Sequence, residues 1–298
     1  MSDRIETYLE ALRTAMAGTD PALANDAVYD AGEYLRTAVE GLDPADDAAV
    51  ESVIDDYGSP EEIAAAYLEI EETVRGALRT PPPRRPRGIV GRFFGVLVDP
   101  RHWAALAYLL GAIATGFAYT FLAVGGAALT GALLIFVVGI PFGLLYLGTT
   151  RAVSLVEGRI VEALLGERMP RRPLLGPVEE GWLGRFKHWV TSRRTWTTLV
   201  YLAAQLPLGI AYVTVIGGGL LVSLWAIIGP FAQAIGDVPF IKEGATEVYL
   251  DGAAMPFVVL AGVVAVPLLL RLAGLVGRLH ARYAKWMLVG SLDTARRG

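Results

Sequence analysis

The sequence predicts an all-α protein: a small cytosolic helical bundle, followed by a polytopic α-helical membrane domain made of two parallel hairpin repeats. Three observations support this prediction. Several uncharged apolar runs have about the 20 residues that a bilayer core requires. A pattern of Trp, Tyr and paired Gly returns at a fixed offset of 93 residues. The segment 1–75 has nineteen acidic and four basic residues, whereas the rest of the chain has 22 basic and 11 acidic residues.

The apolar runs cover residues 103–123, 127–149, 196–235 and 252–270. Core helices of a soluble protein would carry polar residues on every turn, so these runs favour membrane spans. The third run is long enough for nearly two crossings. We expect four crossings in total, with 219–235 forming a partial, re-entrant or outer-surface helix that Gly229 and Pro230 interrupt.

Arginine and lysine fall mainly in three blocks, at residues 79–101, 151–194 and 271–297. Cytoplasmic loops of membrane proteins are enriched in these residues, so the blocks and both termini are expected in the cytoplasm. The stretch 236–251 has four acidic residues and one lysine and is expected outside. The prediction is a multi-pass protein of the cell membrane.

The repeat is carried by residues that ordinary apolar composition rarely aligns. Repeat 1 covers about residues 99–166 and repeat 2 about 192–290, and the common charge pattern predicts that they are parallel, related by an axis along the membrane normal. Their marker residues are Trp103, Tyr108, Gly116, Ala118, Tyr119, Gly125 and Gly126, and then Trp196, Tyr201, Gly209, Ala211, Tyr212, Gly218 and Gly219.

Each repeat ends in a stripe of apolar residues at helical spacing. The first contains Val153, Val156, Ile160 and Leu164, and the second Val276, Leu279, Tyr283 and Met287. We place Arg151, Glu157, Arg159 and Glu162 off the first stripe. These segments either lie in the plane of the membrane as amphipathic helices or pack against the cytosolic ends of the spans.

Residues 1–79 form the expected acidic domain, and 80–90 a Pro- and Arg-rich linker that proline makes semi-rigid; residues 91–298 form the membrane domain. In this acidic domain, called the head below, apolar residues recur at helical spacing. They are Ile5, Leu9, Leu12 and Met16, then Ala24, Val28, Leu35 and Val39, then Val50 and Ile54, then Ile63, Tyr67 and Ile70. Ser59, Pro60 and Glu62 have the spacing of a capped helix start.

Two parts of the chain resemble known families. The pattern Asp99 to Trp103, Tyr108, Gly116 to Tyr119, Gly139 to Pro141 and Leu164 to Gly166 resembles the putative-sensor membrane domain of prokaryotic signalling proteins. The segment Asp56 to Ala64 is similar to the small helical signalling domain called HAAS. The first resemblance implies a sensor domain of a kind often placed before a histidine kinase. Since no chain follows Gly298, we expect no kinase domain in this protein.

The residue inventory argues against an enzyme. The three histidines, His102, His188 and His280, do not share metal-ligand spacing, and there is no cysteine. The glycines 217–219 lack the Lys that a phosphate-binding loop requires. We therefore expect no catalytic residue, no cofactor and no metal. A more specific hypothesis is a ligand-binding groove between the repeats. It would be lined by Trp103, Tyr108, Tyr119, Trp196, Tyr201 and Tyr212.

The predicted function is a membrane sensor or signal-transduction accessory that relays a membrane or extracellular signal to a cytosolic protein. The alternative is a transporter-like protein for a small solute or a lipid. The expected partners are the lipid bilayer, a cytosolic protein that binds the acidic domain and possible further copies of the chain, with no direct contact to nucleic acid. The chain has three lysines, and its N-terminal domain is strongly acidic. This composition indicates either a salt-loving prokaryote, where salt screens the repulsion between the acidic groups, or an acidic domain that binds a basic partner.

Overall fold

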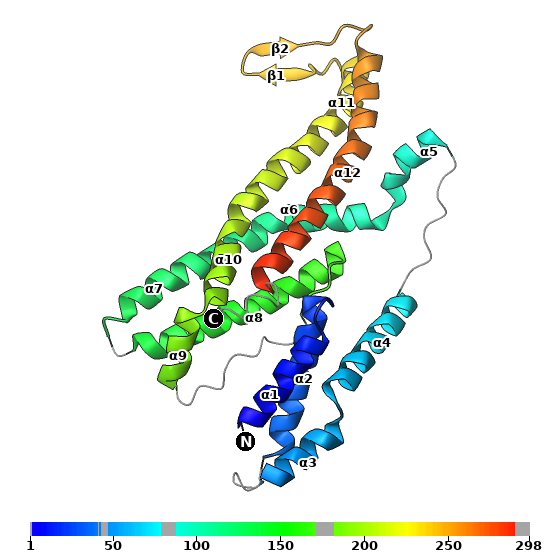
Figure 1. Cartoon of the computed structure of the whole chain (residues 1–298). Coiled ribbons are helices and arrows are strands. Elements are labelled where there is room, and N and C mark those ends of the chain that lie inside the picture. Colours follow the sequence, from blue (N-terminus) through cyan, green and yellow to red (C-terminus); the bar gives the residue numbers. More distant parts are fainter. Residues whose placement is uncertain are drawn as a thin grey trace.

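The computed structural model describes residues 2–40, 42, 47–78, 88–136, 138–170 and 182–289. The linker segment 79–87 and part of the second basic block, at 171–181, lie outside these residues. The described part is almost entirely helical, as the sequence predicts, apart from one small two-stranded sheet. Figure 1 shows two parts, a helical head coloured blue to cyan and a body of longer helices.

The head consists of α1 (Ser2–Ala15), α2 (Pro21–Ala38), α3 (Asp47–Tyr57) and α4 (Pro60–Leu78). Its core contains the apolar positions that the helical spacing predicts on α1 and α2, together with Val50. The predicted start of α4 is confirmed, because Glu62 accepts hydrogen bonds from the Ser59 backbone N–H at 3.0 Å and from the Ser59 hydroxyl at 2.9 Å. These bonds lower the pKa of Glu62. Ile70 differs from the prediction and is 62% exposed.

The body begins with α5 (Ile89–Phe94) and the short 3-10 turn η1 (Gly95–Val98). Two pairs of helices follow, and they cross each other in Figure 1. The first pair has α6 (Pro100–Thr120), the π turn η2 (Phe121–Gly125) and α7 (Gly126–Leu133) as one arm and α8 (Gly139–Leu165) as the other. After α9 (Trp182–Thr191), the second pair has α10 (Arg193–Tyr212), the π turn η3 (Val213–Gly217) and α11 (Gly218–Gly236) as one arm and α12 (Met255–Leu288) as the other.

Four helices are long and apolar enough to cross a membrane, at Pro100–Leu133, Gly139–Leu165, Arg193–Gly236 and Met255–Leu288. The chain is thus a multi-pass membrane protein, and the number of spans agrees with the sequence prediction. The third helix has 44 residues and is about 66 Å long at 1.5 Å per residue. Since a bilayer core is only about 30 Å thick, this helix must tilt strongly or extend beyond the core.

The first predicted turn is wrong. The apolar runs 103–123 and 127–149 place this turn at residues 124–126, but Gly125 and Gly126 lie inside a helix that continues through the π turn to Leu133. The turn comes after Leu133, where Gly139 N–H donates to Phe136 O at 3.0 Å. A Cβ atom on Gly139 would lie 2.3 Å from Leu133 O, so glycine is required there. The turn exposes Leu134, Ile135, Phe136 and Val138.

The predicted interruption at Gly229 and Pro230 is also wrong. Both residues are buried in α11, which continues to Gly236. The Gly229 position is covered by Phe240, whose ring would lie 2.8 Å from an added Cβ atom. Phe240 also stacks on Trp225, whose indole N–H donates to Phe240 O at 2.8 Å. The absence of a side chain at Gly229 therefore leaves room for the Phe240 ring at the tip of this hairpin, and Gly229 does not break the helix.

That tip is the acidic stretch that the sequence predicts outside the membrane. It contains β1 (Ile241–Glu243) and β2 (Thr246–Val248), which pair antiparallel with Lys242 opposite Glu247. Gln233 of α11 holds the end of the tip through two bonds with the Leu250 backbone, at 2.8 and 2.9 Å.

The two helix pairs meet where α6 crosses α10. A Cβ atom on Gly116 would lie 2.8 Å from Leu206 Cα, and one on Gly209 would lie 2.7 Å from Ala112 O. An added Cβ atom on Gly116 would also lie 2.9 Å from the backbone O atom of Gln205. The two close approaches are equivalent, because Gly116 and Gly209 are 93 residues apart, and so are their neighbours Ala112 and Gln205. Gly111, also on α6, faces open space.

We expect Gly116→Ala to destabilise the bundle by about 1 to 3 kcal/mol, because the added methyl group overlaps the α10 backbone, which cannot move aside like a flexible side chain. Gly111→Ala adds the same methyl group where nothing lies within 4 Å, and it is the matched control. Thermal unfolding of the purified variants in one detergent measures the difference. Equal melting temperatures for the two variants would show that the crossing is not tightly packed.

Candidate functional site: a buried polar cluster between the four spans

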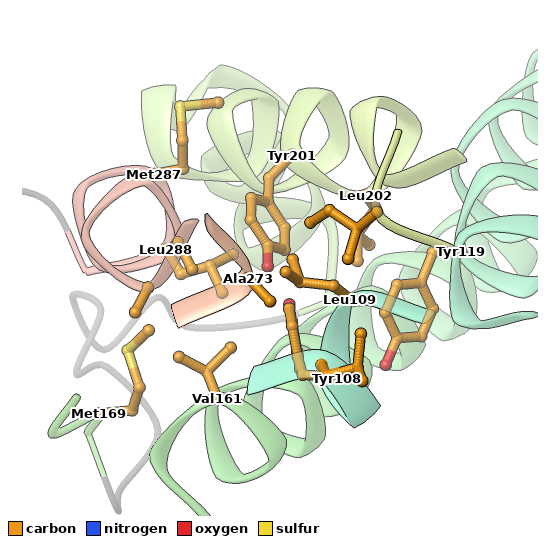
Figure 2. Packing of buried hydrophobic residues seen from close by; sticks show 14 of the residues in the cluster. Tyr108, Leu109, Tyr119, Val161, Met169, Tyr201, Leu202, Ala273, Met287 and Leu288 are labelled. Atoms are coloured by element: carbon orange, nitrogen blue, oxygen red, sulfur yellow. The ribbon is translucent and has the colours of Figure 1, made fainter. Parts of the chain in front are cut away.

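Four tyrosines from the two crossing helices converge on the centre of the body. Tyr108 and Tyr119 come from α6, and Tyr201 and Tyr212 from α10. The first three are at most 8% exposed. Figure 2 shows the hydroxyl groups of Tyr108 and Tyr201 pointing toward each other inside the bundle. Tyr201 and Tyr212 follow Tyr108 and Tyr119 at the 93-residue offset found in the sequence, and all four contribute to one cluster.

A single carboxylate, Glu157 of α8, accepts most of the hydrogen bonds. It is 1% exposed. Its Oε1 atom accepts from the Tyr108 hydroxyl at 2.6 Å, the Tyr201 hydroxyl at 3.0 Å and the Gln205 amide at 2.9 Å. Its Oε2 atom accepts from the Tyr119 hydroxyl at 2.9 Å. Four donors match the acceptor capacity of an ionised carboxylate.

A histidine on α12 completes the cluster. His280 is 2% exposed, and its Nε2 atom lies 2.7 Å from the Tyr108 hydroxyl and 3.3 Å from that of Tyr201. Its Nδ1 atom lies 3.0 Å from the Tyr212 hydroxyl. Tyr108 and Tyr201 therefore bridge an acid and a base that belong to different helix pairs.

Glu157 and His280 occupy matching places in the two halves. Each lies eight residues before the end of its helix, at Leu165 in α8 and Leu288 in α12. The apolar stripes recognised in the sequence match at the same spacing, for example Val153 with Val276 and Ile160 with Tyr283. The halves thus contribute equivalent tyrosines to the cluster but different groups, an acid and a base, at its two ends.

Sequence reasoning missed both of these groups. Glu157 was placed off the apolar stripe, but it follows Val153 by four residues and precedes Ile160 by three, so it lies on the buried face. His280 has the same spacing to Val276 and Tyr283. The signal was therefore present, since both side chains lie on an otherwise apolar helical face. The α8 stripe was also partly wrong, because Val156 is 56% exposed.

The structure separates the tryptophans of the predicted groove from its tyrosines. Trp103 and Trp196 are 48% and 56% exposed, and their indole N–H groups donate to Leu97 O at 2.8 Å and Val190 O at 2.9 Å. Their acceptors also have the repeat offset. Tyr119 and Tyr212 lie well inside their helices, which continue to Leu133 and Gly236. Ligand binding by these six residues stays a prediction.

A second polar region joins the head to the same helices. Arg168, just after α8, pairs with Asp26 of α2 at 3.1 Å and with Glu71 of α4. Lys285 of α12 pairs with Asp20 at 2.9 Å and with Glu167 at 2.8 Å. The side chains of Arg168 and Asp26 are 10% and 7% exposed. The Arg168–Asp26 pair is therefore largely shielded from water, unlike an ordinary surface ion pair.

Comparison with known proteins identifies the body. A family model described as putative sensor matches residues 108–288, more than half of the chain. The chain belongs to this family. No curated protein and no solved structure matches the chain. The matched segment begins at Tyr108 and ends at Leu288, so it contains every member of the polar cluster.

Within the putative-sensor segment, the arrangement can do two things chemically. It can hold a buried negative charge, because Glu157 accepts four hydrogen bonds from uncharged donors. It can also redistribute protons, since the bridging hydroxyls both donate and accept. The described residues include no group of three His, Asp or Glu side chains placed to hold a metal ion.

Proposed function

We propose that the protein is a membrane sensor that transmits the state of its buried cluster to a cytosolic protein through the acidic head, without catalysing a reaction itself. The observation that supports this most directly is that α8 and α12 carry both sites. Glu157 and His280 share the hydroxyls of Tyr108 and Tyr201, and the ends of the same two helices hold the head.

The polar cluster and the ion pairs that hold the head lie close together along α8 and α12. Lys285 follows His280 by five residues of one continuous helix, a separation of about 8 Å. On the other side, α8 ends at Leu165, its C-cap Gly166 has a left-handed backbone with φ 73°, and Arg168 follows Gly166 by two residues. A shift or rotation of α12 against α8 at the cluster would therefore change the relative positions of Arg168 and Lys285.

Release of the head would expose acidic groups that now face the body. Asp20, Asp26 and Glu71 belong to the head, and their partners Arg168 and Lys285 are basic. A basic cytosolic protein could bind the same carboxylates once the body no longer holds them. On this proposal, the excess of acidic residues in the head is a binding surface shared between the body and the partner, in line with the HAAS-like interpretation of this domain.

The coupling can be tested by measuring the distance between head and body. The chain has no cysteine, so spin labels can be attached to cysteines placed at Glu33 on α2 and Arg278 on α12, both of which are exposed. We expect one narrow distance distribution in the protein with its native cluster. Replacing both Tyr108 and Tyr201 with phenylalanine removes the hydroxyls that join Glu157 to His280, and a broad distribution is expected.

Tyr146→Phe is the matched control. Tyr146 is also buried in the bundle, and its hydroxyl donates to Ala123 O at 2.8 Å, outside the cluster. This variant should keep the narrow distribution. If the double variant keeps it as well while remaining folded, the cluster does not control the head and the proposed relay is wrong.

A further inference from the structure

With Glu157 ionised, the hydrogen bonds of the cluster assign its protons. Tyr108 and Tyr201 donate to Glu157, so each has its oxygen left to accept. The N–H at Nε2 of His280 therefore donates to Tyr108, and in a neutral ring Nδ1 is then an acceptor for the Tyr212 hydroxyl. In this arrangement Glu157 is negative, every other member is neutral, and the cluster carries one net negative charge.

A buried charge without a countercharge is unfavourable. Every recorded hydrogen-bond partner of Glu157 among the described residues is an uncharged tyrosine or glutamine. His280 faces the hydroxyl groups of Tyr108 on α6 and of Tyr201 and Tyr212 on α10. On its own helix it faces Tyr283, with the two ring centroids 5.9 Å apart. The carboxylate thus has no arginine or lysine among these hydrogen-bond partners, and His280, which shares the Tyr108 hydroxyl with it, is a group that can become positive.

One position in the network can accept a proton with little rearrangement. If Nδ1 of His280 takes up a proton, it becomes a donor to Tyr212, and only the Tyr212 hydroxyl has to turn. The other bonds of Glu157, Tyr108 and Tyr201 keep their directions. The resulting imidazolium would neutralise the carboxylate through the bridging hydroxyl of Tyr108, which lies 2.6 Å from Glu157 Oε1 and 2.7 Å from His280 Nε2.

We propose that the cluster is a binding site for one exchangeable proton, taken up at Nδ1 of His280 as the countercharge of Glu157. The proton comes from water and is returned to water, and no covalent bond other than N–H is made or broken. Proton binding stands by itself, and it rests on the proposed function only in naming the proton as the signal that the head reports.

The test is nuclear magnetic resonance of the full chain in lipid nanodiscs, with the histidine ring nitrogens labelled with 15N. The chain has three histidines, and His280→Gln assigns the signal of interest. As the pH is lowered from about 8 to below the range in which free histidines titrate, roughly pH 5 to 8, we expect the His280 ring to change from one bound proton to two. In Glu157→Gln, the carboxylate charge is lost and the change should disappear from this range.

Two outcomes would overturn the proposal: an unchanged number of protons on His280 across the range, or the same titration in Glu157→Gln as in the parent chain. Where Glu157→Gln fails to fold, Tyr212→Phe serves instead, because it removes the partner of Nδ1 and leaves the bonds of Glu157 in place. Its midpoint should move, whereas Tyr146→Phe should leave it unchanged; an unmoved midpoint in Tyr212→Phe would likewise contradict uptake at Nδ1. These signals report the proton whether or not the head responds, so a failed relay and a failed proton site are distinguishable.

Discussion

Glu157→Ala is expected to destabilise the folded chain by at least about 3 kcal/mol, because several buried donors lose the acceptor that they share. The substitution leaves three tyrosine hydroxyls and the Gln205 amide without their acceptor. Each buried donor that loses its partner costs about 1 to 3 kcal/mol unless it finds another. Thermal or denaturant unfolding of the purified protein measures the effect.

Glu162→Ala is the control for this result. Glu162 lies on the same helix five residues later, its side chain is 23% exposed, and it pairs with Arg159 at 3.3 Å. Exposed helix pairs of this kind contribute only about 0.3 to 0.5 kcal/mol. If Glu157→Ala were no more harmful than Glu162→Ala, the cluster would not be a closed network, and water would have to be satisfying its donors.

The second large effect is expected at the contact between head and body. Arg168→Ala leaves Asp26 and Glu71 without the guanidinium that joins them. Truncating one partner of a buried, hydrogen-bonded charge pair costs about 2 to 5 kcal/mol. We therefore expect the head to separate from the body while its own core, built from α1, α2, α3 and α4, stays folded.

Hydrogen exchange separates these two effects. In Arg168→Ala, backbone amides at 166–169 should exchange faster, while the buried amides of α1 should keep their protection. Arg282→Ala is the control, because Arg282 is exposed on α12 three residues before Lys285. Unchanged exchange at 166–169 in Arg168→Ala would contradict the view that this ion pair holds the head.

The sequence was most informative where a pattern has one physical cause. Leu9 and Leu12 are fully buried because helical spacing places them on the core face, and Ser59 with Glu62 caps α4 as the spacing requires. The repeat offset makes Tyr108 and Tyr201 equivalent, and the two hydroxyls meet at one carboxylate. The orientation of the repeats in the membrane and the side on which each terminus lies stay predictions.

The wrong predictions concern residues whose role depends on a contact with a residue farther along the sequence. Glycine pairs and a Gly-Pro step look like helix breaks, but Gly126 lies against the Tyr146 ring and Gly229 against Phe240. Glu157 looks like a surface charge until four donors from other helices are placed around it. Neither local propensity nor periodicity specifies which helices will pack together, so the polar cluster could be predicted only in part, from its tyrosines.

The tips of the two hairpins differ in a way that bears on how the chain enters the membrane. The first tip exposes Leu134, Ile135, Phe136 and Val138 and has no Asp, Glu, Lys, Arg or His from Trp103 to Thr150. Insertion of this hairpin transfers no charge through the hydrocarbon. The second tip carries four carboxylates and Lys242, and each such group costs about 2.5 to 3.5 kcal/mol at the centre of the bilayer. During biogenesis the first hairpin can therefore partition directly into lipid, whereas the second needs a polar path for its tip.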